Sequence, residues 1–249
     1  MTHFNMKNKL KAAAKKYLSS DSQRKIIQYT NWPPVGFVQF GNLRRLSPID
    51  TEWGFSRGLP LDRYYIERFL STNENDIKGK VLEVKDNYYT KKFGGDKVQH
   101  SDVLHKKEGN SIATVVADIS VENDIPSDTY DCIIFTQTLQ FIYDVKPAIN
   151  TLHRILKKNG TLLVTLPVIS QISPDDMKLW GDYWRFTSVS SNRMFGEVFE
   201  AENIDVQAVG NIMVSTAFLY GLASEELKQK ELDYIDPNYE FLITIKATK

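Results

Sequence analysis

Three acidic residues in the first half of the chain, Glu83, Asp102 and Asp118, each lie in or directly after a short apolar run. Glu83 and Asp102 are nineteen positions apart, a spacing typical of α/β sheets that hold a ribose at the carboxyl edge of their strands. One carboxylate there can accept hydrogen bonds from two ribose hydroxyls, and another can accept from an adenine amino group. The three acids together predict a nucleotide-binding sheet edge.

These acids must be positioned by strands that alternate with helices. Short apolar runs predict strands at 81–84, 98–102, 113–117, 130–135, 161–166, 204–209 and 239–247. Apolar residues at helical spacing predict helices at 63–71, 146–158, 191–199 and 212–222. Asp62 is the expected N-cap of the first helix, and Gly160 is the expected left-handed cap after the second. The alternation indicates an α/β fold with a doubly wound, seven-stranded, mostly parallel sheet and an N-terminal helical or irregular extension.

In a sheet of this kind the ligand lies outside the carboxyl ends of the strands, where the strand order reverses. The residues at the ends of the first four strands should therefore line the site. They are Glu83, Lys85, Asn87, Tyr89, Asp102, Val103, Asp118, Ile119, Thr136 and Gln137.

The order of these strands and acids resembles class I S-adenosylmethionine-dependent methyltransferases of the type 11 kind. The stretch 127–135 reads like that family's fourth strand, and 153–163 looks like its junction between helix and fifth strand, the most specific match. The likeness covers roughly residues 55–247. It implies a Rossmann-like methyltransferase fold with S-adenosylmethionine as cofactor. By this resemblance the cofactor site is lined by Glu83, Asp102, Asp118 and Gln137.

Two further stretches are similar to methyltransferases encoded with polysaccharide-assembly enzymes. They are 57–65, with Arg57-Gly58 and Asp62-Arg63-Tyr64-Tyr65, and 180–187, which reads Trp-Gly-Asp-Tyr-Trp-Arg-Phe-Thr. This likeness implies O-methyl transfer to a hydroxyl of a sugar, glycan or glycolipid, with another small-molecule acceptor as an alternative. The residues expected to contact the acceptor are Arg57, Tyr64, Tyr183, Trp184 and Arg185.

Methyl transfer to a hydroxyl usually needs a general base as well as positioning. The candidate bases are Asp182, His100, His105 and Tyr183. Asp182 is preferred because it lies in the insertion after the fifth strand, which should face the acceptor. The alternative for Asp182 is an ion pair with Arg185, three residues on.

The loop after the first strand departs from the family pattern. The family has glycines there, which let the backbone approach the ligand with positive φ, but residues 85–89 read Lys-Asp-Asn-Tyr-Tyr. Asn87 tolerates left-handed geometry, whereas Lys85 adds a Cβ and a charge. Two outcomes stay open. Either Lys85 swings aside or pairs with the cofactor's carboxylate in a working site, or the site is degraded and the chain is a non-catalytic binding or scaffold partner in glycan assembly.

The composition argues against several other classes of protein. Lys+Arg and Asp+Glu are both 31 in 249 residues, so no nucleic-acid partner is expected. Four scattered histidines and the single Cys132 give no metal-ligand spacing, and no glycine motif for a phosphate or a dinucleotide is present. No apolar stretch approaches the ~18 residues of a membrane span, and no signal peptide is recognisable, so the expected location is the cytoplasm.

The first sixty residues differ from the rest of the chain. Residues 1–30 carry seven Lys/Arg against one acid, a net charge of +6 that −6 elsewhere balances. A helix over 4–18 is either a basic amphipathic helix for an anionic membrane or acidic partner, or a solvated arm. The segment 30–62 is rich in breakers but holds five aromatic residues, so it should pack against the body as a lid. We therefore expect an arm and lid over 1–60 and a methyltransferase domain over 61–249.

Overall fold

The computed structural model describes residues 19–22, 25, 28 and 32–249. The chain forms two compact units, residues 1–46 and residues 47–249. The helix predicted over 4–18 lies outside the described residues, so contact with a membrane or an acidic partner through it stays a prediction. None of the described helices is long and apolar enough to cross a membrane.

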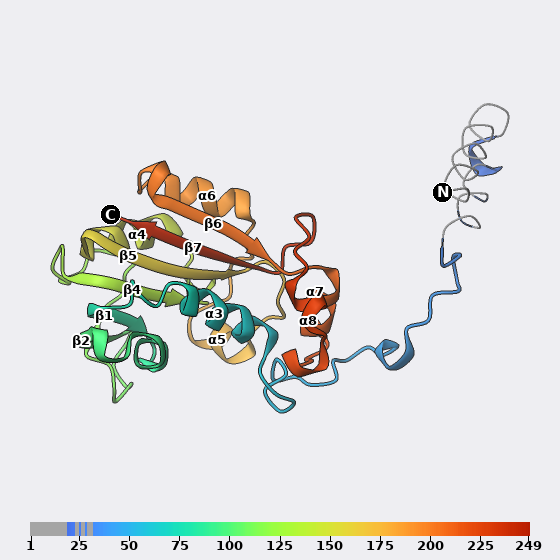
Figure 1. Cartoon of the computed structure of the whole chain (residues 1–249), viewed down its shortest axis with the longest axis horizontal. Helices are drawn as coiled ribbons and strands as arrows, with labels where there is room; N and C mark the ends of the chain where they lie inside the picture. The colour runs from blue at the N-terminus through green and yellow to red at the C-terminus, as the bar shows by residue number, and fades with distance from the viewer. Residues whose placement is uncertain (1–18, 23–24, 26–27, 29–31) are drawn as a thin grey trace. The chain divides into compact units, whose positions relative to one another are not determined.

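The second unit is built on one seven-stranded sheet (Figure 1). In sheet order the strands are β3 (Val115–Val116), β2 (Val98–His105), β1 (Gly79–Val84), β4 (Tyr130–Thr136), β5 (Leu156–Pro167), β7 (Leu242–Thr248) and β6 (Ile204–Val209). β7 is antiparallel to both of its neighbours, and every other adjacent pair is parallel. The predicted fold class, a doubly wound and mostly parallel sheet of seven strands, is confirmed.

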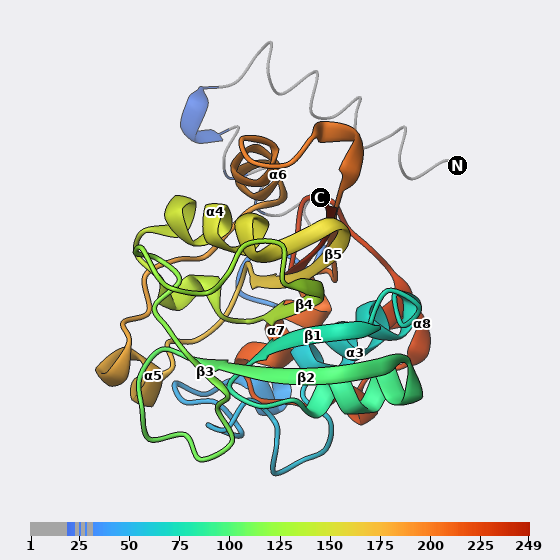
Figure 2. The ribbon, with the colours of Figure 1, turned by 90° about the vertical axis from the view of Figure 1, so that its left-hand side faces the viewer.

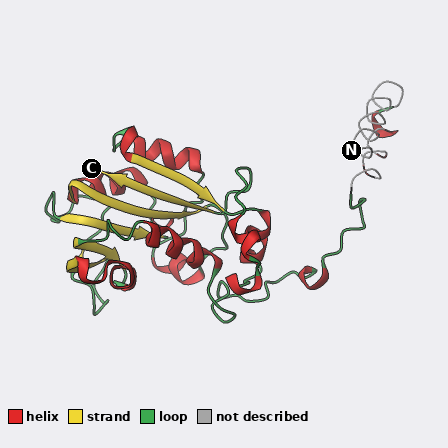
Figure 3. Ribbon diagram, viewed as in Figure 1, coloured by secondary structure: helices red, strands yellow, loops and turns green. Residues whose placement is uncertain are grey.

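Helices cover both faces of this sheet (Figures 2 and 3). One apolar layer is completed by α4 (Val145–Ile155) and α6 (Ser188–Gly196). The other is completed by α3 (Leu61–Thr72), α7 (Ile212–Leu219) and α8 (Gln229–Asp233), while α5 (Pro174–Leu179) belongs to the insertion after β5. Short helical turns lie at Gly41–Leu43, Thr90–Gly94, Gly95–Lys97, Leu139–Phe141, Ala201–Asn203 and Ser224–Glu226. Because β4 is covered from both sides, the apolar run 132–135 is completely buried.

The junction between α4 and β5 differs from the expectation. The helix ends at Ile155 and the strand begins at the next residue, so Gly160 lies inside β5 and is not a helix cap. The left-handed residue is Asn159, with φ +63°. Gly160 is needed for space, because a Cβ there would lie 2.8 Å from the carbonyl oxygen of Lys157.

Two other element boundaries correct the sequence prediction. Pro60, not Asp62, is the N-cap of α3, and Asp62 lies in the first helical turn. β2 does not end at Asp102 but continues to His105. The strand extends because Val103 and Leu104 pair with the last residues of β1 and are buried between the two apolar layers.

The aromatic residues of the segment 30–62 behave differently from one another. Trp53 packs against the layer that contains α3, as predicted. Phe55, which belongs to the same unit as Trp53, is 59% exposed. Trp32, Phe37 and Phe40 belong to the unit 1–46, so the packing of that part of the segment against the body stays a prediction.

Candidate active site

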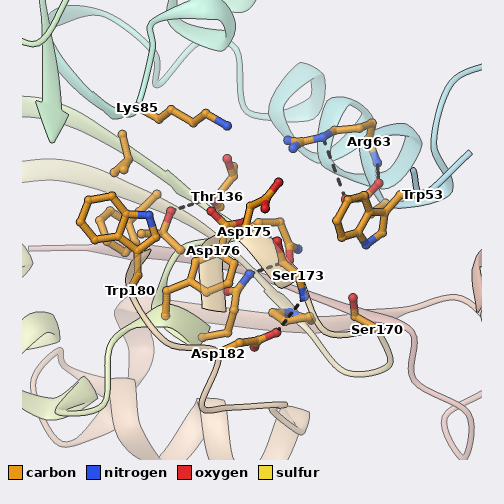
Figure 4. A pocket seen from close by; sticks show the side chains of 18 of the residues that line it. Trp53, Arg63, Lys85, Thr136, Ser170, Ser173, Asp175, Asp176, Trp180 and Asp182 are labelled. Atoms are coloured by element: carbon orange, nitrogen blue, oxygen red, sulfur yellow. Dashed lines mark hydrogen bonds and ion pairs between the residues drawn. The ribbon is translucent and has the colours of Figure 1, made fainter. Parts of the chain in front are cut away.

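A cleft with a volume of about 1360 Å³ opens at the carboxyl ends of the parallel strands. It lies where the strand order reverses, between β1 and β4, the place where open α/β sheets bind ligands. Its walls come from the loops after β1, β2, β3, β4 and β5 and from α3. Figure 4 shows side chains from these segments converging on it.

The structure brings many, but not all, of the predicted site residues to this cleft. Those that line it are Glu83, Lys85, Tyr89, Asp118, Ile119, Thr136, Gln137, Asp182 and Arg185. Those that do not line it are Asn87, Asp102, Val103, Arg57, Tyr64, Tyr183 and Trp184.

Glu83 holds the loop after β1 in place. The residue is 3% exposed, and its carboxylate accepts hydrogen bonds from the backbone N–H of Tyr89 at 3.1 Å and from the N–H and Oγ1 of Thr90, both at 2.7 Å. Burial raises the pKa of Glu83 to about 7, despite these bonds. Glu83 therefore shapes the cleft by tying the loop back to its strand.

Lys85 occupies the left-handed conformation that a glycine usually takes, with φ +74°. Two hydrogen bonds impose it: the backbone N–H of Lys85 donates to Leu104 O at 2.9 Å, and Asn110 Nδ2 donates to Lys85 O at 2.7 Å. At this one position the loop therefore keeps the left-handed geometry of a glycine without having the glycine. Asn87 turns away from the cleft, and its Nδ2 donates to Ser101 Oγ at 3.2 Å.

Asp102 lies in the middle of β2 and is saturated by partners. Thr114 Oγ1 donates to it at 2.7 Å and Tyr130 Oη at 3.2 Å, while Lys80 Nζ lies at 3.3 Å and His100 Nε2 at 3.1 Å. Burial raises its pKa, but the bonds from Thr114 and Lys80 bring the pKa below its ordinary value. This side chain serves the packing between strands and does not reach the cleft. Val103 is likewise buried in β2.

The actual carboxyl end of β2 is basic. His105 and Lys106 line the cleft where an acid was expected. Lys106 Nζ pairs with Asp118 at 2.9 Å, and Asp118 also accepts from the N–H and Oγ of Ser120 at 2.9 and 2.6 Å. Burial raises the pKa of Asp118, but the bonds from Ser120 and Lys106 lower it below its usual range. His105 contacts the edge of Trp180, with ring centroids 5.5 Å apart.

The end of β4 presents buried polar atoms without partners. Gln140 Nε2 donates to Gln137 Oε1 at 3.4 Å, which leaves Gln137 Nε2 and Gln140 Oε1 buried with no hydrogen-bond partner among the described residues. Gln137 also has a positive φ of +46°, and its backbone N–H donates to Thr165 O at 2.9 Å. Unpaired buried groups and a strained backbone together mark this strand end as a candidate functional position.

Asp182 and Arg185 form a closed ion pair in the insertion after β5. Arg185 donates twice, to Oδ1 at 2.5 Å and Oδ2 at 3.0 Å, and Ser173 N–H donates to Oδ2 at 3.2 Å. The Asp182 side chain is 2% exposed. Burial raises its pKa, but the bond from Arg185 brings the pKa below its ordinary value. The geometry matches the ion-pair alternative for Asp182 and makes it a poor general base.

The other predicted acceptor residues have structural contacts outside the cleft. Arg57 forms a two-bond ion pair with Glu226, and Tyr64 Oη accepts from Gln229 Nε2 at 3.0 Å. Trp184 Nε1 donates to Ile142 O at 3.1 Å. Tyr183 and Trp184 both contact the ring of Tyr143, with centroids 5.4 and 5.8 Å away.

Several lining residues were missed from the sequence. α3 contributes Asp62, Arg63 and Glu67, and the turn before it contributes Trp53. Arg63 Nη1 donates to Tyr89 Oη at 3.1 Å, so it bridges α3 to the loop after β1. The signal was present in the 57–65 stretch, where Asp62 and Arg63 directly precede Tyr64, which was predicted to contact the acceptor.

Residues 79–164 match the family model described as a methyltransferase domain. This span runs from β1 into β5 and contains every cleft residue between Glu83 and Ile142. Residues 79–164 are therefore similar to a methyltransferase domain, and this match supports S-adenosylmethionine as the cofactor.

No curated protein matches the chain. Among solved structures, an S-adenosylmethionine-dependent methyltransferase from Archaeoglobus fulgidus is similar at 11% identity and a TM-score of 0.49, over 75% of this chain and 94% of that one. A putative methyltransferase from Bacillus halodurans is similar at 12% identity and 0.46, over 74% and 98%. Phosphoethanolamine N-methyltransferase 2 from Haemonchus contortus, in complex with S-adenosyl-L-methionine, is similar at 14% identity and 0.48, over 84% and 55%.

The residues of the cleft fit this cofactor with one exception. Leu104, Ala117 and Ile119 give an apolar wall at the ends of β2 and β3, suited to an adenine face, and Asp118 lies beside them. The unpaired donor of Gln137 is available at the end of β4. The exception is the ribose position at the end of β2, where His105 and Lys106 replace the usual acid.

Proposed function

We propose that the protein is an S-adenosylmethionine-dependent O-methyltransferase whose acceptor is a hydroxyl of a sugar, glycan or glycolipid. The observation that carries methyl transfer is the cleft of about 1360 Å³ at the switch point of the sheet. One small-ligand site typically occupies ~300–1,000 Å³. The cleft is large enough for a cofactor and an acceptor to lie in it together, as a direct transfer between them requires.

In one half of the cleft, the cofactor would be held by the loop after β1 and by Asp118, Ile119 and Gln137. When bound, S-adenosylmethionine supplies a methyl group already activated on a sulfonium. The protein's part is then to fix the two ligands in line and to keep water out, and such positioning can supply much of the acceleration.

The acceptor half would be the side lined by Trp53, Ser173, Asp175, Asp176 and Trp180 (Figure 4). Aromatic faces can cover the apolar face of a sugar ring, while carboxylates and a hydroxyl can bond its hydroxyl groups. Among the described residues Asp175 has one ion-pair partner, Lys178 at 3.9 Å, and Asp176 accepts from Ser173 Oγ at 2.7 Å. These two carboxylates replace Asp182 as the groups proposed to take the acceptor's proton.

A second function is favoured by the basic end of β2. His105 and Lys106 stand where the family has a ribose-binding acid, and Lys85 stands where it has a glycine. These replacements support the alternative of a non-catalytic methyltransferase-fold protein that acts as a binding or scaffold partner in glycan assembly.

Calorimetric titration and thermal unfolding with S-adenosylmethionine test both functions. At a concentration one hundred times its dissociation constant, a ligand stabilises the folded state by about 2.7 kcal/mol. An enzyme should show heat of binding and this stabilisation, and Asp118→Ala should weaken the binding. Absence of both effects at millimolar cofactor would exclude the enzyme and favour the scaffold.

The acceptor can be identified with methyl-labelled cofactor and a panel of free sugars, nucleotide-activated sugars and glycolipids. We expect label in a sugar product that Asp175→Asn, Asp176→Asn and their combination make more slowly, with cofactor affinity unchanged. Label found only on amines, or a double variant as active as the wild type, would contradict the proposed acceptor or the proposed base.

A further inference from the structure

The insertion between β5 and α6 leaves the sheet and returns to it at one point. The backbone N–H of Phe186 donates to Pro167 O at 2.9 Å, so the insertion begins and ends at the carboxyl end of β5. Arg185 ties its two arms together, because it pairs with Asp182 and its Nη2 donates to Gln171 O at 2.9 Å. The base of the insertion is therefore fixed at β5.

The outer part of the insertion, α5, is held much less firmly. This short helix has no buried residue. Its side-chain contacts, from Ser173 to Asp176 and between Asp175 and Lys178, stay within the insertion as far as the described residues go. Yet Asp175 and Asp176 line the acceptor side of the cleft. Their position over the cleft therefore depends on whatever holds the end of α5.

Trp180, directly after α5, makes a contact with the far side of the cleft. The centroid of its ring lies 5.5 Å from that of His105, with the two planes at 84°, and Lys107 Nζ lies 5.2 Å from the Trp180 ring centroid. His105 is itself oriented, because its Nδ1 donates to Lys107 O at 2.5 Å. We call this contact of Trp180 with His105 and Lys107 the latch. It joins the insertion after β5 to the end of β2.

The latch spans the mouth of the cleft. β1 and β4 lie between β2 and β5 in the sheet, and adjacent strands are about 4.8 Å apart, so the two ends are separated by roughly 14 Å. The crevice between β1 and β4, where the cofactor is expected, lies within this span. Residues 169–176, Leu179 and Trp180 all line the cleft, and Figure 4 shows Trp180 and Trp53 on opposite sides of it. A ligand that enters must therefore pass the insertion.

Gly181 separates the latch from the fixed base of the insertion. Its φ is +91°, and a Cβ there would clash with the ring of Tyr183, so the chain turns at a position that requires glycine. Hinges of moving segments often lie at such positions. A cation–π contact and one aromatic edge contact are individually weak at an exposed site, so together they favour the latched arrangement by roughly 5- to 50-fold. Opening at Gly181 is thus accessible.

We propose that Trp180 is a positioning residue that latches α5 onto the end of β2, across the mouth of the cleft. Latched, α5 covers the bound cofactor and holds Asp175 and Asp176 toward the acceptor half. Released, it lets ligands enter and leave. For the two acids this role rests on the proposed function, whereas the control of cofactor exchange does not depend on the acceptor.

The first test follows the exchange of S-adenosylmethionine and S-adenosylhomocysteine by surface plasmon resonance on the full chain. Trp180→Ala should raise both the association and the dissociation rate constants about 5- to 50-fold and keep Kd within about threefold, since an open mouth eases passage in both directions. A merely structural role would instead weaken the affinity. Trp180→Phe and Lys107→Arg, which keep a ring and a cation, should recover most of the slow exchange.

Met177→Ala is the matched control for Trp180→Ala. Met177 is exposed on α5 and does not line the cleft, so this variant should keep the rate constants of the wild type. Thermal unfolding of Trp180→Ala without ligand should show a midpoint within about 3 °C of the wild type, as expected for the loss of weak surface contacts. Faster exchange would then not reflect a loss of folding.

A covalent replacement of the latch gives the converse test. Lys107→Cys combined with Trp180→Cys removes the contact and supplies two thiols, while Cys132, the single native cysteine, is buried. Before cross-linking, this double variant should exchange both ligands as fast as Trp180→Ala. After a bis-maleimide reagent joins the thiols, both rate constants should fall to those of the wild type or below. The single-cysteine variants treated with the same reagent should stay fast.

The positioning of the two acids is tested with an acceptor from the labelled-cofactor panel. In a single turnover at saturating cofactor and acceptor, Trp180→Ala should transfer the methyl group about tenfold more slowly or worse, because misplaced catalytic groups lose much of their effect. Transfer as fast as in the wild type would overturn the positioning role.

The other outcomes separate the latch from the proposed function. Equal exchange rates in the wild type and Trp180→Ala, or a cross-linked protein that exchanges as fast as before cross-linking, would overturn the latch and leave the proposed function standing. A wild type that binds neither S-adenosylmethionine nor S-adenosylhomocysteine would overturn the proposed function, and the latch with it.

Discussion

The end of β2 and the crevice between β1 and β4 carry similar residue types but use their charges differently. At the end of β2, Lys106 is paired with Asp118, which follows β3 and also accepts from Ser120, so both charges are compensated inside the fold. In the crevice, the ammonium group of Lys85 has no hydrogen bond or ion pair with a described residue, and Gln137 Nε2 is buried without a partner among those residues. A saturated group must give up bonds to meet a ligand, whereas an unsatisfied one gains by it. Ligand recognition should therefore concentrate in the crevice, and Asp102 within β2 should act mainly on stability.

In the insertion after β5, as in β2, the acidic side chain is paired within the fold. Asp182 was selected from the sequence as a base, yet its lone pairs are taken by Arg185 and Ser173. Acidic residue type alone does not separate a catalytic carboxylate from a structural one. The number of hydrogen-bond and ion-pair partners separates the two, and that number is set by the folded chain.

The largest effect that can test this comparison is expected for Asp182→Asn. Removing one charge of a buried pair leaves the other uncompensated, which typically costs about 3 kcal/mol or more. Urea unfolding should show a loss of about 2–4 kcal/mol, with Arg185 partly exposed and thus somewhat less penalised. Asp175→Asn, an exposed control, should change stability by less than about 0.5 kcal/mol. Equal stability of the two variants, with methyl transfer lost only in Asp182→Asn, would return Asp182 to the role of base.

The next effect concerns the pH dependence that Glu83 contributes. Its pKa in the folded protein is raised from 4.5 to about 7. A raised carboxyl pKa gives stability that is present below the unfolded value and lost as pH rises through the folded value, here about 3 kcal/mol in all. Urea unfolding of wild type and Glu83→Gln at about pH 4 and about pH 8 should therefore show the wild type losing stability relative to the variant. Parallel pH profiles of the two proteins would show that Glu83 is not held in a protonated state by burial.

A smaller effect is expected for Asp102→Asn. It weakens the contacts to Lys80 and Thr114 inside the sheet, at a cost of about 1–2 kcal/mol. Because Asp102 does not line the cleft, affinity for S-adenosylmethionine should stay within about twofold of the wild type, which is roughly 0.4 kcal/mol. Calorimetry after matched unfolding controls measures both quantities. A strong loss of affinity with unchanged stability would mean that β2 meets the ribose through Asp102 after all.

The smallest effect is a gain in stability from Lys85→Gly. The substitution relieves the left-handed strain at φ +74° but adds freedom to the unfolded chain, so the net gain is about 0.5–1 kcal/mol. Lys91→Gly, in a helical turn, should lose about 1 kcal/mol in the same thermal unfolding measurement. Destabilisation by Lys85→Gly would show that the lysine side chain supports the loop. The crevice would then use this side chain for stability, as β2 does with its own.

Much of the fold was predictable because local sequence patterns determine its strands and helices. The apolar run after Asp131 predicted the central strand β4, and this run is buried. Helical spacing predicted α4, and the residues that carry it are also buried: Ala148, Ile149, Leu152 and Ile155. The strand alternation then limited the sheet to a doubly wound class. Boundaries were less predictable, since β2 gained Val103 and Leu104 by pairing with β1 and His105 by pairing with β3.

The site residues were predictable in kind and less so in place. The sequence alone determined which loops follow the strands, and hence that Glu83, Lys85, Asp118 and Gln137 come to one edge of a sheet. Only the tertiary structure decided that Asp102 stops short of this edge, that Asp182 is closed by Arg185, and that Arg63 on α3 faces the loop that carries Lys85. The reason is physical: a local pattern sets how a segment folds, but the register between strands and the partners of each charge come from segments far apart in the chain.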